Sequence, residues 1–268
     1  MSTNCLKTLA LIFMLIDHIG EFIPNSPVFL RYIGRLAAPL FFFCSVWGLH
    51  HTKNKAVYIT RLYLLGVFMG IVNACFSYHY NIWLRNNIFT TLFAGSFITM
   101  ILESANTPKK KMTYATGLVF YQILAFFICA LLAEFLQFPS VLDTDALYYL
   151  YGAIFGSCIF TEGSVFLVCY YCLLYLFKDN TRRLFIFHVL YSLMITYLSI
   201  RYQNYRGLFF YLIPFTNFQG LMILAAPFYL LYNGRRGKNL KYFYYIFYPV
   251  HIWILCIIKV ALESAPTK

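Results

Sequence analysis

The sequence predicts an all-α protein, a polytopic bundle of about nine to ten transmembrane helices, some of them broken or re-entrant. Hydrophobic residues make up 61% of the 268 residues and charged residues only 11%, whereas soluble domains carry roughly a quarter charged residues. The apolar residues form blocks of about 15 to 25 residues, which is the length that a helix needs to cross a bilayer. We expect one integral-membrane domain over residues 1–268 with the lipid bilayer as a partner and no nucleic acid.

Nine apolar blocks are the candidate crossings. The sixth is too long for one straight helix, and Thr161 to Gly163 interrupt it, which predicts two short helices or half-helices. Pro214 and Asn217 interrupt the eighth, and residues 77–87 form an aromatic and amide-rich connector suited to re-entering the bilayer. The blocks are Cys5 to Ile23, Phe29 to Leu49, Val57 to Phe76, Ile88 to Leu102, Met112 to Phe135, Ala146 to Phe177, Leu184 to Ile200, Leu208 to Tyr232 and Tyr242 to Val260.

The distribution of lysine and arginine predicts the orientation, because cytoplasmic loops retain positive charge. With a cytoplasmic N-terminus and one passage through the sixth block, most basic residues lie inside, and Arg85, Arg201, Arg206 and Lys268 lie outside. A hairpin in the sixth block would instead move the basic segments 178–183 and 235–241 outside and erase this bias. The charge pattern therefore favours an odd number of crossings, most simply nine.

Ionisable residues within the first two crossings are the clearest functional signal, because such groups are costly at membrane depth. Asp17 and His18 lie about 15 Å of helix beyond Lys7. Arg31 and Arg35 are four residues apart, on one face of the next crossing, and should share that depth. Asp17 can pair with Arg35 or Arg31 as a buried ion pair without chemistry. Alternatively, His18 acts as a general base while an arginine holds an anionic group or a developing oxyanion.

His18 needs a partner from another helix, because adjacent side chains on a helix diverge by about 100° and Asp17 therefore points elsewhere. The last crossing contains Tyr248, Pro249 and His251, with His251 near mid-membrane. Pro249 frees a backbone carbonyl and can kink the helix. His251 is either a hydrogen-bonded packing residue or a second residue of the site.

Two further polar groups lie at the ends of crossings. His51, Lys53, Lys55 and Arg61 form a basic cluster that could hold the phosphates of a cytoplasmic ligand, or that only orients the chain and contacts lipid. The fourth crossing starts with polar residues whose helix N-terminus could bind an anion; these are Asn86, Asn87, Thr90 and Thr91. No metal site is expected, since the only Cys-x-x-Cys pattern, Cys169 to Cys172, lies within an apolar helix.

The sequence motifs resemble those of a known family. Ile16-Asp17-His18-Ile19-Gly20, the segment from Arg31 to Phe41 and the ending Phe247-Tyr248-Pro249-Val250-His251 together are similar to the TraX family. This family is named for a bacterial conjugation protein that N-acetylates pilin, and it looks like a branch of the polytopic membrane acyltransferases. One departure is Trp47-Gly48, where the family leads us to expect a Glu-Gly type of sequence.

The resemblance implies transfer of an acetyl group from cytoplasmic acetyl-CoA, as co-substrate, to an amine or hydroxyl of an acceptor in the bacterial cytoplasmic membrane. The acceptor would be a peptide N-terminus, a sugar or a lipid-linked glycan. The resemblance implies a catalytic role for His18, with Arg35 as its neighbouring arginine, and we expect Asp17 to be catalytic as well. The residues expected at the acceptor are Arg31, His251 and Tyr248, and those expected at the CoA phosphates are Arg61, Lys53, Lys55 and His51.

Two other classes of function remain open from the residues alone. A transporter or lipid flippase could use Asp17, His18, Arg35 and His251 as a proton or substrate pathway. A non-catalytic membrane assembly factor could use the same polar residues only to fix helix packing.

Overall fold

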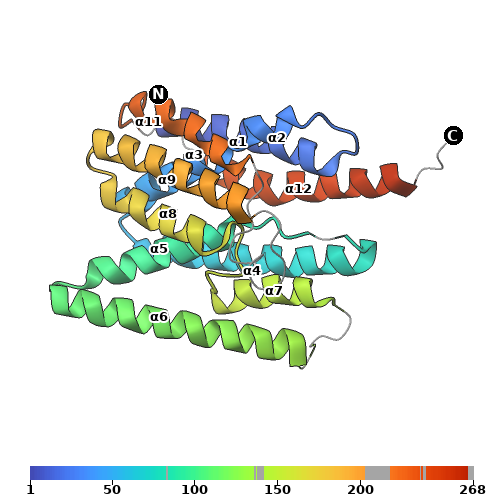
Figure 1. The fold of residues 1–268 in the computed structure, drawn as a ribbon, viewed down its shortest axis with the longest axis horizontal. Coiled ribbons are helices and arrows are strands. Elements are labelled where there is room, and N and C mark those ends of the chain that lie inside the picture. The colour runs from blue at the N-terminus through green and yellow to red at the C-terminus, as the bar shows by residue number, and fades with distance from the viewer. Residues whose placement is uncertain are drawn as a thin grey trace. The chain divides into compact units, whose positions relative to one another are not determined.

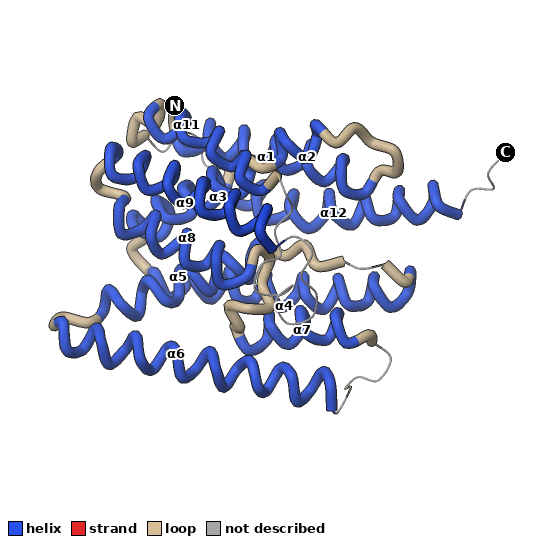
Figure 2. The backbone as a smooth tube through the Cα atoms, viewed as in Figure 1, coloured by secondary structure: helices blue, strands red, loops and turns tan. Residues whose placement is uncertain are grey.

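The computed structural model describes residues 1–264 except 83, 136, 138–141, 203–217, 236, 238 and 239. Within these residues every regular element is helical, as Figures 1 and 2 show, which confirms the all-α fold class. The elements are α1 (Thr3–Phe22), α2 (Phe29–Gly34), α3 (Ala37–His51), α4 (Lys55–Tyr80), α5 (Ile88–Ser104), α6 (Pro108–Ala130), η1 (Leu131–Phe135), α7 (Thr144–Phe155), α8 (Ser164–Phe177), α9 (Thr181–Tyr202), η2 (Gln219–Ala225), α11 (Ala226–Leu230) and α12 (Lys241–Ser264).

Five helical segments of the described chain are long and apolar enough to cross a membrane: Phe29–His51, Lys55–Tyr80, Pro108–Phe135, Thr181–Arg201 and Tyr242–Ser264. Three shorter apolar helical segments accompany them, Ile88–Ser104, Ser164–Phe177 and Gln219–Leu230. The chain is therefore a multi-pass membrane protein. Nine crossings, and the passage of α1 through the bilayer, remain predictions.

The second predicted crossing is not one continuous helix, because α2 ends at Gly34 and α3 begins at Ala37. Pro39 supplies the reason: it has no N–H to donate to the carbonyl of Arg35, so the hydrogen-bond ladder is interrupted there. The amide of Arg35 instead bonds the carbonyl of Tyr32 over a distance of 3.3 Å, as in a tighter helical turn. Arg31 and Arg35 still emerge close together, one within α2 and one just after it.

The sixth predicted crossing is divided as expected. α7 and α8 are separated by residues 156–163, and the glycines at both ends of this connection, Gly156 and Gly163, adopt positive φ angles of 61° and 80°. The eighth predicted crossing falls partly outside the described residues, which exclude Pro214 and Asn217; its described part is η2 and α11.

The chain divides into two compact units, each described here by itself. Unit 1 comprises the described residues within 1–47, 176–204 and 215–268, and unit 2 those within 48–175 and 205–214. Unit 1 thus holds α1, α2, most of α3, α9, η2, α11 and α12, and unit 2 holds α4 to α7, η1 and most of α8.

In unit 1, α1 packs along α12, and the two helices run in the same direction. The hydroxyl of Thr8 lies 3.1 Å from that of Tyr244, and further along both helices Nδ1 of His18 lies 2.7 Å from Nε2 of His251. The N-terminus is tied to the segment after α11, where the amide of Thr3 donates to the carbonyl of Arg235 at 2.8 Å. The two contacts between α1 and α12 therefore show that the first and last helices of the described chain pack in parallel.

In unit 2, α4 packs between α5 and α7, and α5 also contacts α6. Asparagine side chains bind this group together. The amide nitrogen of Asn73 donates to the carbonyl of Asn86 at 2.9 Å, and that of Asn87 donates to the carbonyl of Gly66 at 2.8 Å. Such bonds satisfy backbone carbonyls that an apolar environment would otherwise leave without a partner.

Candidate functional site

A buried carboxylate of α1 lies between two arginines of the α2 region. Asp17 is 8% exposed, and Nη2 of Arg35 lies 2.5 Å from each of its carboxylate oxygens. Nη1 of Arg31 lies 3.1 Å from Oδ2 of the same carboxylate. The buried ion pair that residue spacing allowed is therefore present, and it involves both arginines.

The same arginines also make contacts beyond Asp17. Arg31 donates to Oε2 of Glu21 at 2.8 Å and to the backbone carbonyl of Asp17 at 2.9 Å. Arg35 donates from Nη1 to Oε1 of Gln219 at 2.9 Å and from Nε to the carbonyl of Arg31 at 3.2 Å. Two carboxylates and two guanidinium groups thus balance in charge. The donors of Arg35 are largely committed to groups of the protein itself.

Gly34 allows α2 to approach this close to Asp17. A Cβ added at Gly34 would lie 2.1 Å from the Cβ of Asp17 and 2.2 Å from its Oδ1. No real pair of carbon atoms that are not bonded approaches so closely, so only glycine fits against the carboxylate.

On another side of α1, His18 and His251 form a hydrogen-bonded pair. His18 is 3% exposed and His251 6%. Nδ1 of His18 lies 2.7 Å from Nε2 of His251, and the two rings are stacked with an interplanar angle of 18°. Nδ1 of His251 lies 2.8 Å from the carbonyl oxygen of Phe247.

The carbonyl of Phe247 fixes the direction of this hydrogen-bond chain. A carbonyl only accepts, so Nδ1 of His251 is the donor, and in neutral His251 the remaining nitrogen, Nε2, is the acceptor. His18 must then donate from Nδ1. When His18 is neutral, its lone pair is consequently on Nε2, and only that nitrogen can then take up a proton.

Aromatic side chains enclose the histidine pair. Tyr248 is buried, with its ring centroid 6.4 Å from that of His18 and 5.8 Å from that of His251. Phe22 packs edge-on against His18 at 6.2 Å, and Phe247 stacks on His251 at 4.9 Å. These apolar walls limit the access of water to the imidazoles.

The structure brings six of the predicted site residues together in unit 1: His18, Asp17, Arg35, Arg31, His251 and Tyr248. Asp17 and His18 have different hydrogen-bond partners, as expected, since Asp17 pairs with the α2 region and His18 with α12. Their ligand atoms nevertheless lie within 4.8 Å of each other. Sequence reasoning missed Glu21 and Gln219. Glu21 stands four residues after Asp17 on the same helix, a spacing that could have revealed it, whereas nothing in the sequence connects Gln219 to Arg35.

The predicted phosphate-binding residues belong to unit 2. His51, Lys53 and Arg61 are exposed, and Lys55 is partly buried in an ion pair with Glu103. Glu103 also accepts a hydrogen bond from the hydroxyl of Tyr175 at 2.9 Å. This basic end of α4 keeps exposed positive groups that an anion can reach.

Asp17, His18 and Glu21 offer ligand atoms within 4.8 Å of one another, which is close enough to hold a metal ion. The arginines argue against such a use. Both oxygens of Asp17 accept from Arg35 and Glu21 accepts from Arg31, so a cation would have to displace guanidinium groups and remain beside them. We assign no metal to this cluster.

Comparison with known proteins gives one family match and two relatives. The family model described as TraX protein matches residues 2–259. A probable fimbrial assembly protein, FimC of serogroup H1, from Dichelobacter nodosus is 24% identical over 266 residues, which is 96% of either chain. An uncharacterised protein of Rickettsia prowazekii (strain Madrid E) is 34% identical over 92 residues, 34% of either chain. No solved structure matches.

Proposed function

Because the chain belongs to the TraX family, we propose that it is a membrane-embedded acetyltransferase that uses acetyl-CoA as donor and acetylates an amine or hydroxyl of a membrane-presented acceptor. The observation that carries this proposal is the buried hydrogen bond between His18 and His251, whose direction is set by the carbonyl of Phe247. A histidine used only for packing has no need of a second histidine to fix its tautomer. A general base does, because its lone pair must point at the substrate.

The proposed reaction is a direct transfer. The nitrogen or oxygen of the acceptor attacks the thioester carbonyl and forms the new C–N or C–O bond while its proton passes to Nε2 of His18. The C–S bond then breaks, and the proton held by His18 leaves with the sulfur as the CoA thiol. His251 stabilises the imidazolium by accepting from Nδ1 throughout.

Asp17 and Arg35 act as positioning residues in this proposal. Their pairing is internally satisfied, and it fixes α1 against the α2 region at the residue next to His18. This rigid packing of α1 holds the imidazole of His18 in place during proton transfer. Arg31 does the same through Glu21, while Tyr248 packs against both histidines and is the proposed contact for the acceptor.

The donor is proposed to bind through basic residues at the start of α4. Arg61, Lys53, Lys55 and His51 lie at the end of unit 2 that the charge pattern predicts to be cytoplasmic. Guanidinium and ammonium groups there suit the phosphates of CoA. The bacterial cytoplasmic membrane, with a cytoplasmic N-terminus, is the location that this arrangement requires.

For the acceptor, we propose a fimbrial or pilin subunit with a free amine. Support comes from the family and from the full-length relative in Dichelobacter nodosus, which is described as a probable fimbrial assembly protein. A sugar or a lipid-linked glycan remains the second type of acceptor to assay.

The test is acetyl transfer from radiolabelled acetyl-CoA to a peptide with a free N-terminus, measured with purified protein in vesicles. We expect transfer by the wild type and a loss of at least about 100-fold in His18→Gln, the range for removal of a general base. His79→Gln, which changes an exposed histidine near the end of α4, is the matched control and should retain transfer. Equal rates in both variants would contradict the proposal.

A non-catalytic assembly factor is the second candidate, and one observation favours it. Asp17, Glu21, Arg31 and Arg35 form a closed, balanced ion cluster of the kind that fixes helix packing. If the protein is such an assembly factor, His18→Gln would leave fimbrial assembly in cells unchanged. Replacement of Asp17 would abolish fimbrial assembly, because the fold would be lost.

A further inference from the structure

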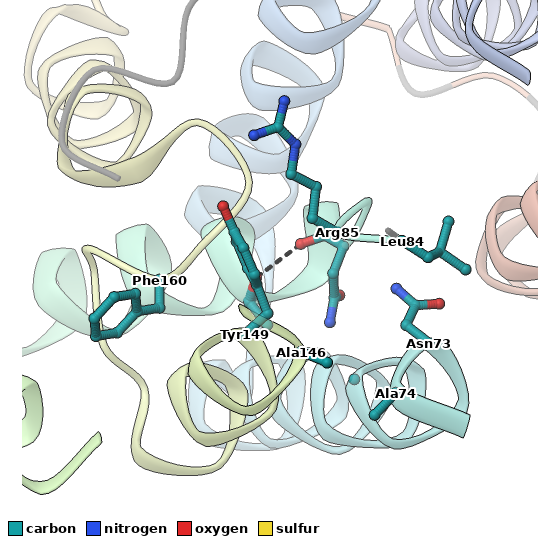
Figure 3. A pocket seen from close by; sticks show the side chains of 10 residues that line it. Asn73, Ala74, Leu84, Arg85, Ala146, Tyr149 and Phe160 are labelled. Atoms are coloured by element: carbon teal, nitrogen blue, oxygen red, sulfur yellow. Dashed lines mark hydrogen bonds between the residues drawn. The ribbon is translucent and has the colours of Figure 1, made fainter. Parts of the chain in front are cut away.

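Unit 2 contains a small polar pocket outside the histidine site. It lies among the second half of α4, the segment before α5, and α7; Figure 3 shows its lining side chains. The cavity measures about 10 Å³, which is room for one water-sized group. Its polar lining residues are Asn73, Arg85, Asn87, Thr90 and Tyr149.

One buried acceptor in this pocket has no partner. Asn87 is 6% exposed, and its amide nitrogen donates to the carbonyl of Gly66, but its oxygen Oδ1 receives no hydrogen bond. An unsatisfied buried acceptor costs free energy, so a donor is expected to fill the space in front of it. That donor must be no larger than a water molecule.

The charges around the pocket have both signs. Arg85 donates a hydrogen bond to the hydroxyl of Tyr149, and Asp145 and Glu162 lie close enough to act electrostatically on the same hydroxyl. Figure 3 shows the tips of Arg85 and Tyr149 on the same side of the pocket. The N-terminus of α5, which begins directly after Asn87, adds a partial positive charge.

This pattern suits a zwitterion. An ammonium group is about the size of water, carries only donors, and would satisfy Oδ1 of Asn87. A phosphate beside it would face Arg85 and the start of α5. A trimethylammonium group has no N–H to donate and is too large for the cavity, and a glycerol hydroxyl carries no positive charge.

The pocket also lies near one end of the helix pair α4 and α5. Asn73 stands about 10 Å of helix before the end of α4 at Tyr80, and Asn87 immediately precedes α5. The ion pair of Lys55 and Glu103 marks the opposite end of this helix pair. The ligand therefore enters from the side that the charge pattern predicts to be extracytoplasmic.

We propose that this pocket binds a phosphoethanolamine group, supplied by the headgroup of phosphatidylethanolamine, with the ammonium at Asn87 and the phosphate at Arg85. The site is independent of acetyl transfer, so it can be tested whether or not the protein proves to be an acetyltransferase.

The experiment measures lipid retained by the delipidated, full-length protein after incubation in nanodiscs that contain phosphatidylethanolamine, phosphatidylcholine or phosphatidylglycerol. We expect at least about tenfold preference for phosphatidylethanolamine, as suits hydrogen bonds to charged groups. Asn87→Leu and Arg85→Gln should each remove the preference, and Asn87→Asp, which keeps an acceptor oxygen, should retain it. Arg182→Gln, a change of an exposed arginine in α9, is the control.

Thermal unfolding of each variant separates lost binding from lost fold, and Arg85→Gln, which leaves the bond from Asn87 to Gly66 intact, serves if Asn87→Leu does not fold. If free phosphoethanolamine displaces the retained lipid, the headgroup suffices for binding. If the lipid is retained in the presence of free phosphoethanolamine, the whole lipid is required. Both outcomes support the site. Equal retention of the three lipids, or a preference unchanged in Asn87→Leu and Arg85→Gln, would overturn it and leave a pocket that holds only water.

Discussion

Nδ1 of His18 in α1 lies 2.7 Å from Nε2 of His251 in α12, so a buried hydrogen bond joins the first and last helices of the described chain. The carbonyl of Phe247 orients His251, and His251 in turn orients His18. A relay of this kind gives His251 a defined task, which is to hold the proton of His18 on Nδ1.

Replacement of His251 tests this task. In His251→Phe the ring stacked on Phe247 is kept but the acceptor is lost, and we expect kcat to fall by about tenfold to 100-fold, less than for loss of the base itself. The KM for acetyl-CoA should not change, because the donor is proposed to bind at the start of α4. His251→Gln, whose side-chain oxygen can accept from His18, should recover part of kcat.

If His251 has a purely structural role, a different result is expected for the wild type, His251→Phe and His251→Gln. Activity would then follow the thermal stability of each variant, and the pH dependence of the remaining activity would be unchanged. Measuring the pH profile of kcat alongside Tm therefore separates positioning from packing.

The ion cluster predicts a large loss of stability in Asp17→Asn. This change leaves the largely buried Arg35 and Arg31 without their shared carboxylate, and removal of one member of a buried pair costs about 3 to 5 kcal/mol. The measurement is thermal or denaturant unfolding in detergent. Asp179→Asn is the control, because the exposed carboxylate of Asp179 pairs with Lys178, and ion pairs of exposed groups contribute about 0 to 1 kcal/mol.

The double variant Asp17→Asn/Arg35→Gln should be more stable than the sum of the two single losses predicts, since removal of both charges leaves fewer unpaired ions. Coupling between residues in contact is commonly about 0.5 to 3 kcal/mol. Strict additivity would show that the two groups do not interact in the folded protein.

Much of the fold and part of the candidate site could be predicted from the sequence. Apolar blocks predicted the membrane helices, because helix length and hydropathy are local properties, and Thr161 to Gly163 marked the break between α7 and α8. The spacing of Asp17, Arg31 and Arg35 predicted the ion pair. The contact of His18 with His251 could not be derived from spacing, since it joins residues separated by nearly the whole chain, and the contact of Arg35 with Gln219 carries no pattern.

Gly34 should be sensitive to the addition of a single methyl group. In Gly34→Ala the new Cβ would overlap the side chain of Asp17, and overpacking of this kind costs about 1 to 3 kcal/mol. Gly117→Ala is the matched control, because its Cβ would meet nothing within 4 Å and alanine favours the helix by about 1 kcal/mol. Unfolding of both variants in detergent measures the contrast; a similar Tm for the two would contradict the close approach of α2 to Asp17.

The parallel direction of α1 and α12 makes the last prediction, which concerns topology. If both helices cross the bilayer, parallel packing places the two chain termini on opposite sides, and the number of crossings must be odd. The charge pattern independently favours an odd number with Met1 inside. Reporter fusions at Asn25 and at Lys268 should therefore report outside, and fusions at Thr107 and Asn180 inside. An outside signal at Asn180 would mean that the segment holding α7 and α8 folds back as a hairpin, and an inside signal at Lys268 would contradict the crossing of both terminal helices.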